Sequence, residues 1–356
     1  MSGTIRIALD AMGGDFGPAC VIPAAAQALK ERPSLRFSIF GDAHKINPVM
    51  ASYPALKNAS DVVHTDVFVD NHEKPSSALR KGKNSSMRLA IDAVQSGHAD
   101  CVISAGNTGA LMATAKLVFK TLSGIHRPAI ACIMPNMKGT RTIMLDVGAN
   151  VVADAENLAQ FAVLGSCFAR STCNVEKPSV GILNIGSEDT KGHETLHQAS
   201  AILTQAKFPG VYQGFVEGTD ITAGTVDVVV TDGFTGNVAL KTAEGVGKFI
   251  SGVIRQEFKA SLIAKLGLLF AYGALKKAKK RMDPREYNGA LFLGLANICI
   301  KSHGGADSYA FSRAILVGAT MVEHGFNKMV AEQIEKLNAQ EAFITMSVEG
   351  PEARSA

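Results

Sequence analysis

Residues 5–18 read IRIALDAMGGDFGP, and this stretch decides the fold. It begins with a short apolar run, 5–10, that ends in Asp10 and leads into two adjacent glycines, Gly13 and Gly14. Such a run predicts a buried strand followed by a tight turn. Its hydrophobicity is continuous rather than alternating, as expected of a parallel strand that is covered on both faces.

The same kind of unit recurs along the chain. Further apolar runs predict strands at residues 36–41, 100–106, 129–134, 142–148, 179–186, 212–218 and 226–233. Most of the segments between them carry apolar residues at helical spacing, as at Met87, Ala90, Ile91 and Val94. Strands that alternate with helices form βαβ units, so we expect a largely parallel sheet with helices on both faces.

Composition favours a soluble cytoplasmic protein built as one domain. Hydrophobic residues make up 47% of the chain and charged residues 19%. We find no signal peptide at the start, no Pro- or Ser-rich linker and no internal repeat. The six cysteines form no CxxC pair, which favours reduced, buried thiols. We expect a single domain over residues 1–346 and a disordered tail over 347–356.

The distribution of charged residues along the chain says more about partners than the net charge does. A net charge of +4 is too small to indicate a nucleic-acid partner. Two local clusters are basic, and such patches favour acidic partners or anionic surfaces. They comprise Lys74, Arg80, Lys81, Lys83 and Arg88 in the first case and Lys276, Lys277, Lys279, Lys280 and Arg281 in the second.

Residues 234–281 predict a long helical stretch, of which 260–275 are almost wholly apolar. That run is shorter than the ~20 residues that a spanning helix needs. Three interpretations stay open: a buried dimer helix, an exposed hairpin, or an amphipathic segment on a bilayer. The basic residues that follow favour peripheral membrane contact through 260–281.

Polar and glycine residues follow five of the predicted strands. In a parallel sheet ligands bind beyond the carboxyl ends of the strands, so we expect these loops on one sheet edge. Glycine allows close backbone approach, and helix starts offer free N–H groups to an anion. The loops therefore predict a phosphate site, with simple structural turns as the alternative. They contain Asp10, Gly13 and Gly14; Asn107 and Thr108; Asp146 and Asn150; 184–191; and 232–237.

Several common motifs are missing. The chain has no GxxxxGK[ST], no GxGxxG after the first strand and no GxSxG, which disfavours nucleotidases, dehydrogenases and serine hydrolases. His193 and His197 lie in an HExxH pattern that directly follows Gly192 and has no third ligand motif. We therefore expect no metal and no cofactor.

The loops resemble one family closely. The stretches ALDAMGGDFGP (8–18), SAGNTGALM (104–112), LDVGAN (145–150), ILNIGSEDTKG (182–192), TDGFTGNVALKT (231–242), and NGALFLGL with IKSHGGA (288–306) are similar to motifs of the PlsX family of phosphate acyltransferases. The likeness extends from Ile5 to about residue 320. Ser187 departs from it, because the family usually has an acidic residue there.

The resemblance implies a fold and a reaction. The fold is a three-layer α/β/α sandwich related to phosphate acetyltransferases, with a protruding helical segment near 250–285. The reaction transfers an acyl group from acyl carrier protein to inorganic phosphate, and the acyl phosphate passes to a membrane glycerol-3-phosphate acyltransferase. A homodimer is also implied.

The reaction needs no attacking side chain, because phosphate is itself an ionised nucleophile and a thiolate is a fair leaving group. We expect Lys191 to supply positive charge, Asn237 and Asn107 to donate hydrogen bonds, and His303 to protonate the thiolate or bind phosphate. An exposed lysine, helix N-caps and a structural histidine are the alternatives. The remaining expected phosphate-site residues are Asp10, Gly13, Gly14, Gly106, Thr108, Gly109, Asp146, Asn150, Asp232 and Gly236.

Acyl carrier protein is acidic, so a basic surface should receive it. We expect Arg80, Lys81, Lys83 and Arg88 to form this surface, with an ordinary solvated surface as the alternative. An acyl-CoA-dependent enzyme of the same fold and a non-enzymatic membrane scaffold are the competing functional hypotheses. Comparing acyl-ACP with acyl-CoA as the acyl donor distinguishes the acyl-CoA-dependent enzyme from the carrier-protein-dependent enzyme that we expect.

Overall fold

The described chain forms one eleven-stranded sheet, in the order β3-β2-β1-β4-β11-β10-β5-β6-β9-β7-β8. The computed structural model describes residues 3–260, 270–274, 276–277 and 281–348. The strands are β1 (Ile5–Asp10), β2 (Leu35–Gly41), β3 (Ser60–His64), β4 (Cys101–Ser104), β5 (Ala129–Pro135), β6 (Arg141–Leu145), β7 (Ser179–Leu183), β8 (Val211–Val216), β9 (Val228–Val230), β10 (Ala290–Leu293) and β11 (Ile298–Lys301).

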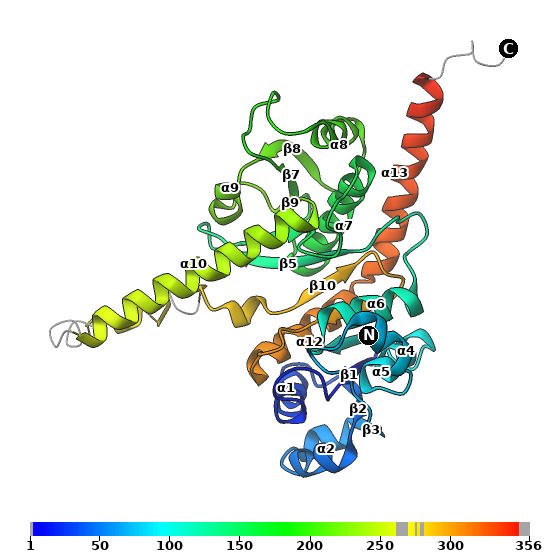
Figure 1. Cartoon of the computed structure of the whole chain (residues 1–356), viewed down its shortest axis with the longest axis vertical. Coiled ribbons are helices and arrows are strands. Elements are labelled where there is room, and N and C mark those ends of the chain that lie inside the picture. Colours follow the sequence, from blue (N-terminus) through cyan, green and yellow to red (C-terminus); the bar gives the residue numbers. More distant parts are fainter. Residues whose placement is uncertain (1–2, 261–269, 275, 278–280, 349–356) are drawn as a thin grey trace.

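Helices cover both faces of this sheet (Figure 1). They are α1 (Pro18–Glu31), α2 (Ala43–Met50), α3 (Pro54–Asn58), α4 (Pro75–Lys81), α5 (Ser86–Gln95), α6 (Thr108–Phe119), α7 (Ala155–Cys173), α8 (Glu194–Gln205), α9 (Gly218–Ala223), α10 (Gly233–Ala260), the 3-10 helix η1 (Pro284–Tyr287), α12 (Ser308–Glu323) and α13 (Phe326–Val348). The helices α1, α7, α8, α12 and α13 contribute to one core cluster, and α5, α6 and the start of α10 to another. The predicted three-layer α/β/α sandwich is confirmed.

Side chains fix the starts of several helices. Ser85 accepts a hydrogen bond from the N–H of Arg88 at the start of α5. Asp154 and Asp307 cap α7 and α12 in the same way. A capped start satisfies N–H groups that have no partner within the helix, so each of these helices begins at a defined residue.

The sheet consists of two parallel parts that run in opposite directions. Neighbouring strands from β3 to β11 are parallel, and so are those from β6 to β8. Between the parts, β11 with β10, β10 with β5, and β5 with β6 are all antiparallel. Three successive reversals leave β6, β9 and β7 antiparallel to β1 and β4. The expectation that all five loops share one carboxyl edge is therefore wrong.

Three strands were not predicted from the sequence. The residues of β3, SDVVH, are half polar. The strands β10 and β11 have only four residues each, and β11 ends in a lysine, so both are shorter than the apolar runs that predicted the other strands. These two strands take part in two of the three reversals, β11 with β10 and β10 with β5, and connect the two parallel parts.

The helix α10 extends away from the rest of the molecule (Figure 1), as the predicted protruding segment does. Its outer part exposes an apolar stripe at helical spacing, including Phe249, which is 70% exposed, and Ile250 and Ile254. Much of the predicted bilayer segment, 260–281, lies outside the described residues. Within the part of the chain that the structure describes, no helix is long and apolar enough to cross a membrane. Most of the predicted tail, 349–356, also lies outside it.

Candidate active site

Asp10, Ser104 and Lys301 occupy one row across the carboxyl ends of three adjacent parallel strands, β1, β4 and β11. The Asp10 side chain is 1% exposed. It accepts hydrogen bonds from the hydroxyl groups of Ser104 and Ser86, each at 2.6 Å. Burial raises the pKa of Asp10 above its ordinary value, although these two serines oppose the shift. The carboxyl group therefore faces inward and binds hydroxyl groups.

A short chain of hydrogen bonds runs from Asp10 to the loop after β4. Ser104 Oγ donates to Asp10 and accepts from the N–H of Gly106 at 3.0 Å. Asp10 thus fixes the backbone direction at the point where the chain turns into α6. The Gly106 N–H is therefore engaged by Ser104 Oγ, and Asp10 holds it only indirectly.

Glycine is required where the loops after β1, β4 and β11 meet. A Cβ at Gly13 would lie 2.6 Å from the Gly106 nitrogen. Gly14 has φ +85°, and a Cβ there would lie 2.9 Å from the Gly304 oxygen. The N–H of Asp15 donates to that same oxygen at 2.9 Å. The three loops therefore touch one another through backbone, which only glycine permits at this spacing.

Lys301 was not predicted as a site residue. It is 7% exposed, and its Nζ donates to the Ala105 oxygen at 3.1 Å and to the Ser302 oxygen. Burial lowers the pKa of Lys301 to about 8, against the opposing effects of Asp10 and Asp15. Its strand, β11, was missed in the sequence, so nothing placed this lysine beside Asp10. The signal that could have found it is a charged residue at the end of the apolar run ICIK.

Asn107 is the N-cap of α6, which was the alternative to its predicted role as a donor. Its side-chain oxygen accepts from the N–H of Ala110 at 3.0 Å. Its amide nitrogen donates to the Asn71 and Glu73 oxygens, both at 2.9 Å, so both of its protons are engaged. The adjoining Thr108 and Gly109 are exposed at the helix start. The helix start therefore offers backbone N–H groups at this edge of the sheet.

His303 follows Lys301 in the same loop and is exposed. Its Nδ1 accepts from the N–H of Gly305 at 3.1 Å, so the neutral ring carries its proton on Nε2. Asn288, which sequence reasoning also missed, holds this loop. It accepts from the N–H of His303 at 3.1 Å and donates to Ser302 Oγ at 2.8 Å and the Ala310 oxygen at 2.9 Å.

A second group of predicted residues surrounds Asp146, at the end of β6 in the other part of the sheet. Asp146 is fully buried and accepts from the N–H groups of Ile130, Gly148 and Ala149 and from both nitrogens of Asn150. Its oxygens are therefore engaged in holding the turn from residue 146 to residue 150. In this structure Asp146 and Asn150 shape the loop.

The start of α10 packs against that turn. Asp232 caps the helix by accepting from the N–H of Thr235 at 2.9 Å. A Cβ at Gly236 would lie 1.9 Å from the Asp146 oxygen, so only glycine fits. Asn237 is exposed, and its amide nitrogen donates to the Val147 oxygen at 2.9 Å. Asp232, Gly236 and Asn237 therefore join the Asp146 group and not the Asp10 group.

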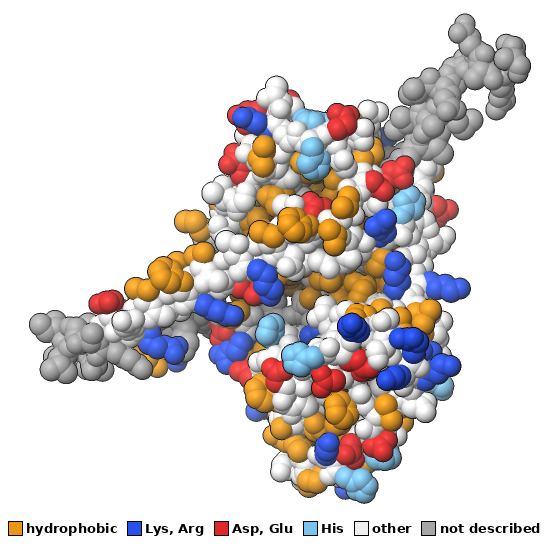
Figure 2. Space-filling model, in the orientation of Figure 1, with side chains coloured by type: hydrophobic (Ala, Val, Ile, Leu, Met, Phe, Trp, Pro, Cys, Tyr) orange, Lys and Arg blue, Asp and Glu red, His pale blue; other side chains and the backbone are white. Residues whose placement is uncertain are grey.

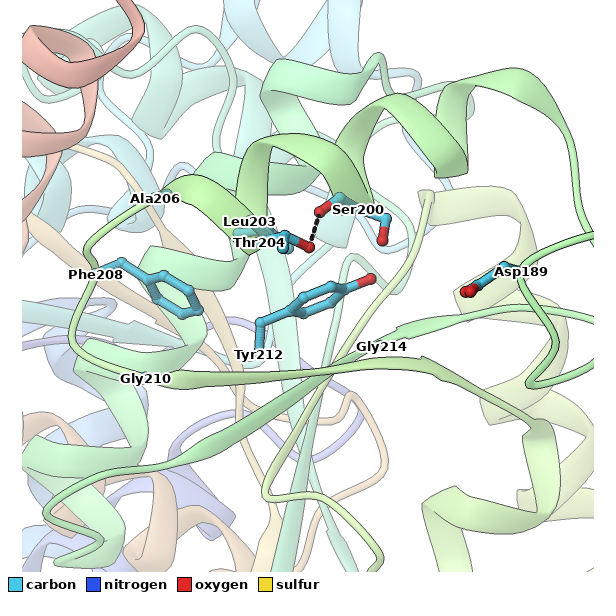
Figure 3. Close-up of a pocket in the computed structure, with 9 residues that line it drawn as sticks. All are labelled: Asp189, Ser200, Leu203, Thr204, Ala206, Phe208, Gly210, Tyr212 and Gly214. Atoms are coloured by element: carbon cyan, nitrogen blue, oxygen red, sulfur yellow. Dashed lines mark hydrogen bonds between the residues drawn. The ribbon is translucent and has the colours of Figure 1, made fainter. Parts of the chain in front are cut away.

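Lys191 lies in a third loop, 184–192, after β7. It is exposed, and Asn184 holds the loop by donating to the Lys191 oxygen at 3.0 Å. The same loop contributes Asp189 to a cavity of about 420 Å³ between α8 and the edge strand β8 (Figure 3). In that view Tyr212 and Phe208 point into the space between strand and helix. Apart from Asp189, which belongs to the predicted loop 184–191, no residue that lines the cavity was predicted as part of a site.

The predicted carrier-protein surface lies beside the Asp10 group. Figure 2 shows Lys and Arg side chains gathered over the region of α4, α5 and α6. Arg80, Lys81 and Lys83 are exposed, whereas Arg88 is half-buried and pairs with Asp92 at 2.8 Å. A Cβ at Gly109 would lie 2.8 Å from Pro75, so the start of α4 packs tightly on the start of α6.

Five of the six cysteines are buried. Burial raises the pKa of Cys20 to about 11 and those of Cys132 and Cys167 to about 12, so these thiols stay protonated near neutral pH. His193 precedes α8 as its N-cap, and His197 packs edge-on against a phenylalanine ring. Among the residues that the structure describes, no group of three His, Cys, Asp or Glu could hold a metal.

Comparison with known proteins identifies the family. Residues 5–329 match the family described as "Fatty acid synthesis protein". A phosphate acyltransferase from Rhodospirillum centenum is 52% identical over 99% of both chains. One from Paramagnetospirillum magneticum is 49% identical over 96% of this chain and 97% of its own. The chain belongs to the PlsX family of phosphate acyltransferases. The family membership predicted from the loops is confirmed. The protein is therefore an acyltransferase of fatty acid and phospholipid synthesis.

Solved structures confirm the expected fold relationship. The EutD phosphotransacetylase from Staphylococcus aureus has a TM-score of 0.60 at 15% identity and covers 89% of this chain and 94% of its own. A phosphotransacetylase from Streptococcus pyogenes has a TM-score of 0.58 at 17% identity, with the same coverage. At such low identity the likeness concerns the fold alone.

Proposed function

We propose that this phosphate acyltransferase forms an acyl phosphate from acyl-[acyl carrier protein] and inorganic phosphate, and releases the carrier protein. The observation that carries the proposal is the Asp10 group, in which three glycine-containing loops and the start of α6 meet beside an exposed basic surface. The group presents backbone amides and a buried ammonium where an anion would bind.

The chemistry suits a site without an attacking side chain. Phosphate oxygen attacks the thioester carbonyl, the carbon–sulfur bond breaks, and the thiolate leaves with the carrier protein. The site must bring phosphate and thioester together and stabilise the oxyanion that forms between them. His303 lies in the loop that follows Lys301 and carries its proton on Nε2 when neutral. It can protonate the departing sulfur.

The attachment of α4 supports the proposed docking of the carrier protein on this surface. Arg80 and Lys81 on α4 and Lys83 just after it are exposed, and the start of α4 touches the start of α6 through Pro75 and Gly109. An acidic partner bound to this surface would bring its thioester arm close to the Asp10 group. Charge complementarity of this kind mainly raises the association rate and falls with salt.

Assembly and location form part of the proposal. The exposed stripe on α10, with Phe249, Ile250 and Ile254, supports a homodimer in which a second copy buries it. The predicted segment 260–281, with its basic end, supports peripheral contact of this cytoplasmic protein with the membrane. There a membrane glycerol-3-phosphate acyltransferase would receive the product.

The test is phosphate-dependent release of free carrier protein from palmitoyl-ACP, with the acyl phosphate trapped by hydroxylamine. We expect release to require phosphate and to yield a hydroxamate in equal amount. Palmitoyl-CoA, offered in place of palmitoyl-ACP, tests the alternative donor. Faster turnover with palmitoyl-CoA would favour the acyl-CoA-dependent enzyme, and release without phosphate would contradict the proposal.

A further inference from the structure

A buried cation lies beneath the loops of the Asp10 group. Lys301 sits at the last position of β11, is 7% exposed, and shares its row with Asp10 and Ser104. Its Nζ donates to two backbone oxygens, those of Ala105 and Ser302. Ala105 and Ser302 directly precede Gly106 and His303 in the sequence. The ammonium group therefore holds the loops after β4 and β11.

Lys301 makes no ion pair within 4.0 Å in the described part of the chain. Asp10 is in the same row, but its oxygens accept from Ser86, Ser104 and the N–H of Met12. A buried charge without a direct ion pair is costly, and the two carbonyl oxygens and the more distant Asp10 and Asp15 carboxylates compensate it only in part. An anion bound close by would complete the compensation.

The surroundings of Lys301 favour an anion between its ammonium group and the start of α6. The α6 helix has twelve residues, and its exposed start at Thr108 and Gly109 follows the loop that Lys301 holds. The positive end of a helix favours an anion. Gly13, Gly14 and Gly106 bring the neighbouring backbone within contact distance. A buried ammonium, a helix start and glycine-lined loops therefore converge at one place.

We infer that Lys301 is a phosphate-binding residue, which supplies the positive charge that holds inorganic phosphate for attack on the acyl thioester. This inference deepens the proposed function and rests on it. It assigns to Lys301 the role first expected of Lys191, which is exposed on a loop after β7 in the oppositely directed part of the sheet. A dianion, rather than a neutral nucleophile, is the substrate that such a site selects.

The first experiment uses Lys301→Met, which keeps the length of the side chain and removes its charge. Lys116→Met is the control, because Lys116 is an exposed lysine on α6. In steady-state assays we expect the KM for phosphate to rise at least about tenfold, as for loss of a charged hydrogen bond, while the KM for palmitoyl-ACP changes less than about twofold. The control should match the unaltered enzyme. An equal rise in both KM values would overturn the inference.

The second experiment does not depend on turnover. Phosphate should raise the melting temperature of the unaltered full-length protein in a concentration-dependent way, since it binds the folded state. That shift should disappear in Lys301→Met. No shift in the unaltered protein would count against the proposed function itself, whereas equal shifts in both proteins would overturn only the role of Lys301.

A third measurement needs no variant, in case Lys301→Met does not fold. Crystals of the unaltered protein grown with tungstate, a dense phosphate mimic, should show the anion among the loops after β1, β4 and β11. Its oxygen should lie about 3 Å from Lys301 Nζ. Tungstate bound only elsewhere, for example beside Lys191, would overturn the inference.

Discussion

Asn288 gives the sharpest test of how the site is held together. Its side chain makes three hydrogen bonds, at 2.8 to 3.1 Å, to Ser302, the N–H of His303 and the Ala310 oxygen. Each such bond contributes about 1 kcal/mol to the free energy of unfolding. His303 is exposed, so its N–H regains a water partner when Asn288 is truncated. Asn288→Ala should therefore lower the free energy of unfolding by about 2–3 kcal/mol.

The same substitution should reduce catalysis, because the loop that carries His303 loses its side support. We expect phosphate-dependent turnover to fall about tenfold, the effect of about 1.4 kcal/mol on the barrier. Urea unfolding followed by far-UV circular dichroism gives the stability, and hydroxamate formation gives the turnover. Asn297→Ala is the matched control, since its one bond, to Gln95, is exposed. Stability and turnover of Asn288→Ala equal to those of the control would contradict this supporting role of Asn288.

Three further predictions concern charge and donors. Lys191→Ala and Asn237→Ala should each lower turnover by about 10²-fold through loss of an oxyanion donor, with the KM for phosphate nearly unchanged because Lys301 holds the phosphate; hydroxamate assays at varied phosphate measure both. Reversing Arg80 and Lys81 to Glu should raise the KM for palmitoyl-ACP and flatten its dependence on salt, with the KM for phosphate unchanged. Because the pKa of Lys301 is lowered from 10.5 to about 8 in the folded protein, the unfolded chain binds more protons between these values. This group's contribution to the free energy of unfolding therefore rises with pH across that window, and urea titrations of Lys301→Met should lack the rise.

The sequence predicted the alternation of strands and helices because continuous apolar runs and helical spacing are local properties. It also placed Asp10, Gly13, Gly14 and Gly106 at one edge correctly, since β1 and β4 are ordinary parallel neighbours. The direction of a distant strand is not a local property. The loops near Asp146 and Lys191 were therefore assigned to the same edge, and the antiparallel pairings of β10 and β5 show that their strands run the other way.

Lys301 and Asn288 were missed for a related reason. A lysine at the end of a four-residue apolar run looks like a solvent-exposed turn residue, because lysine is rarely buried. Its burial follows from the position of β11 between β4 and β10, which only pairing over long sequence distances determines. Asn107 shows the opposite case, since Asn before a helix favours an N-cap on local grounds and the structure has that cap.

The position of β10 and β11 also matters for how the protein is made. These strands come late in the chain, yet they lie in the middle of the sheet, between β4 and β5. Until residues 290–301 leave the ribosome, β4 and β5 each keep an unpaired edge. Such edges invite association with other chains, and pairing across so long a sequence distance is slow. A nascent chain that stops before β10 should therefore aggregate readily. Chaperone binding to the nascent chain until translation is nearly complete would prevent this.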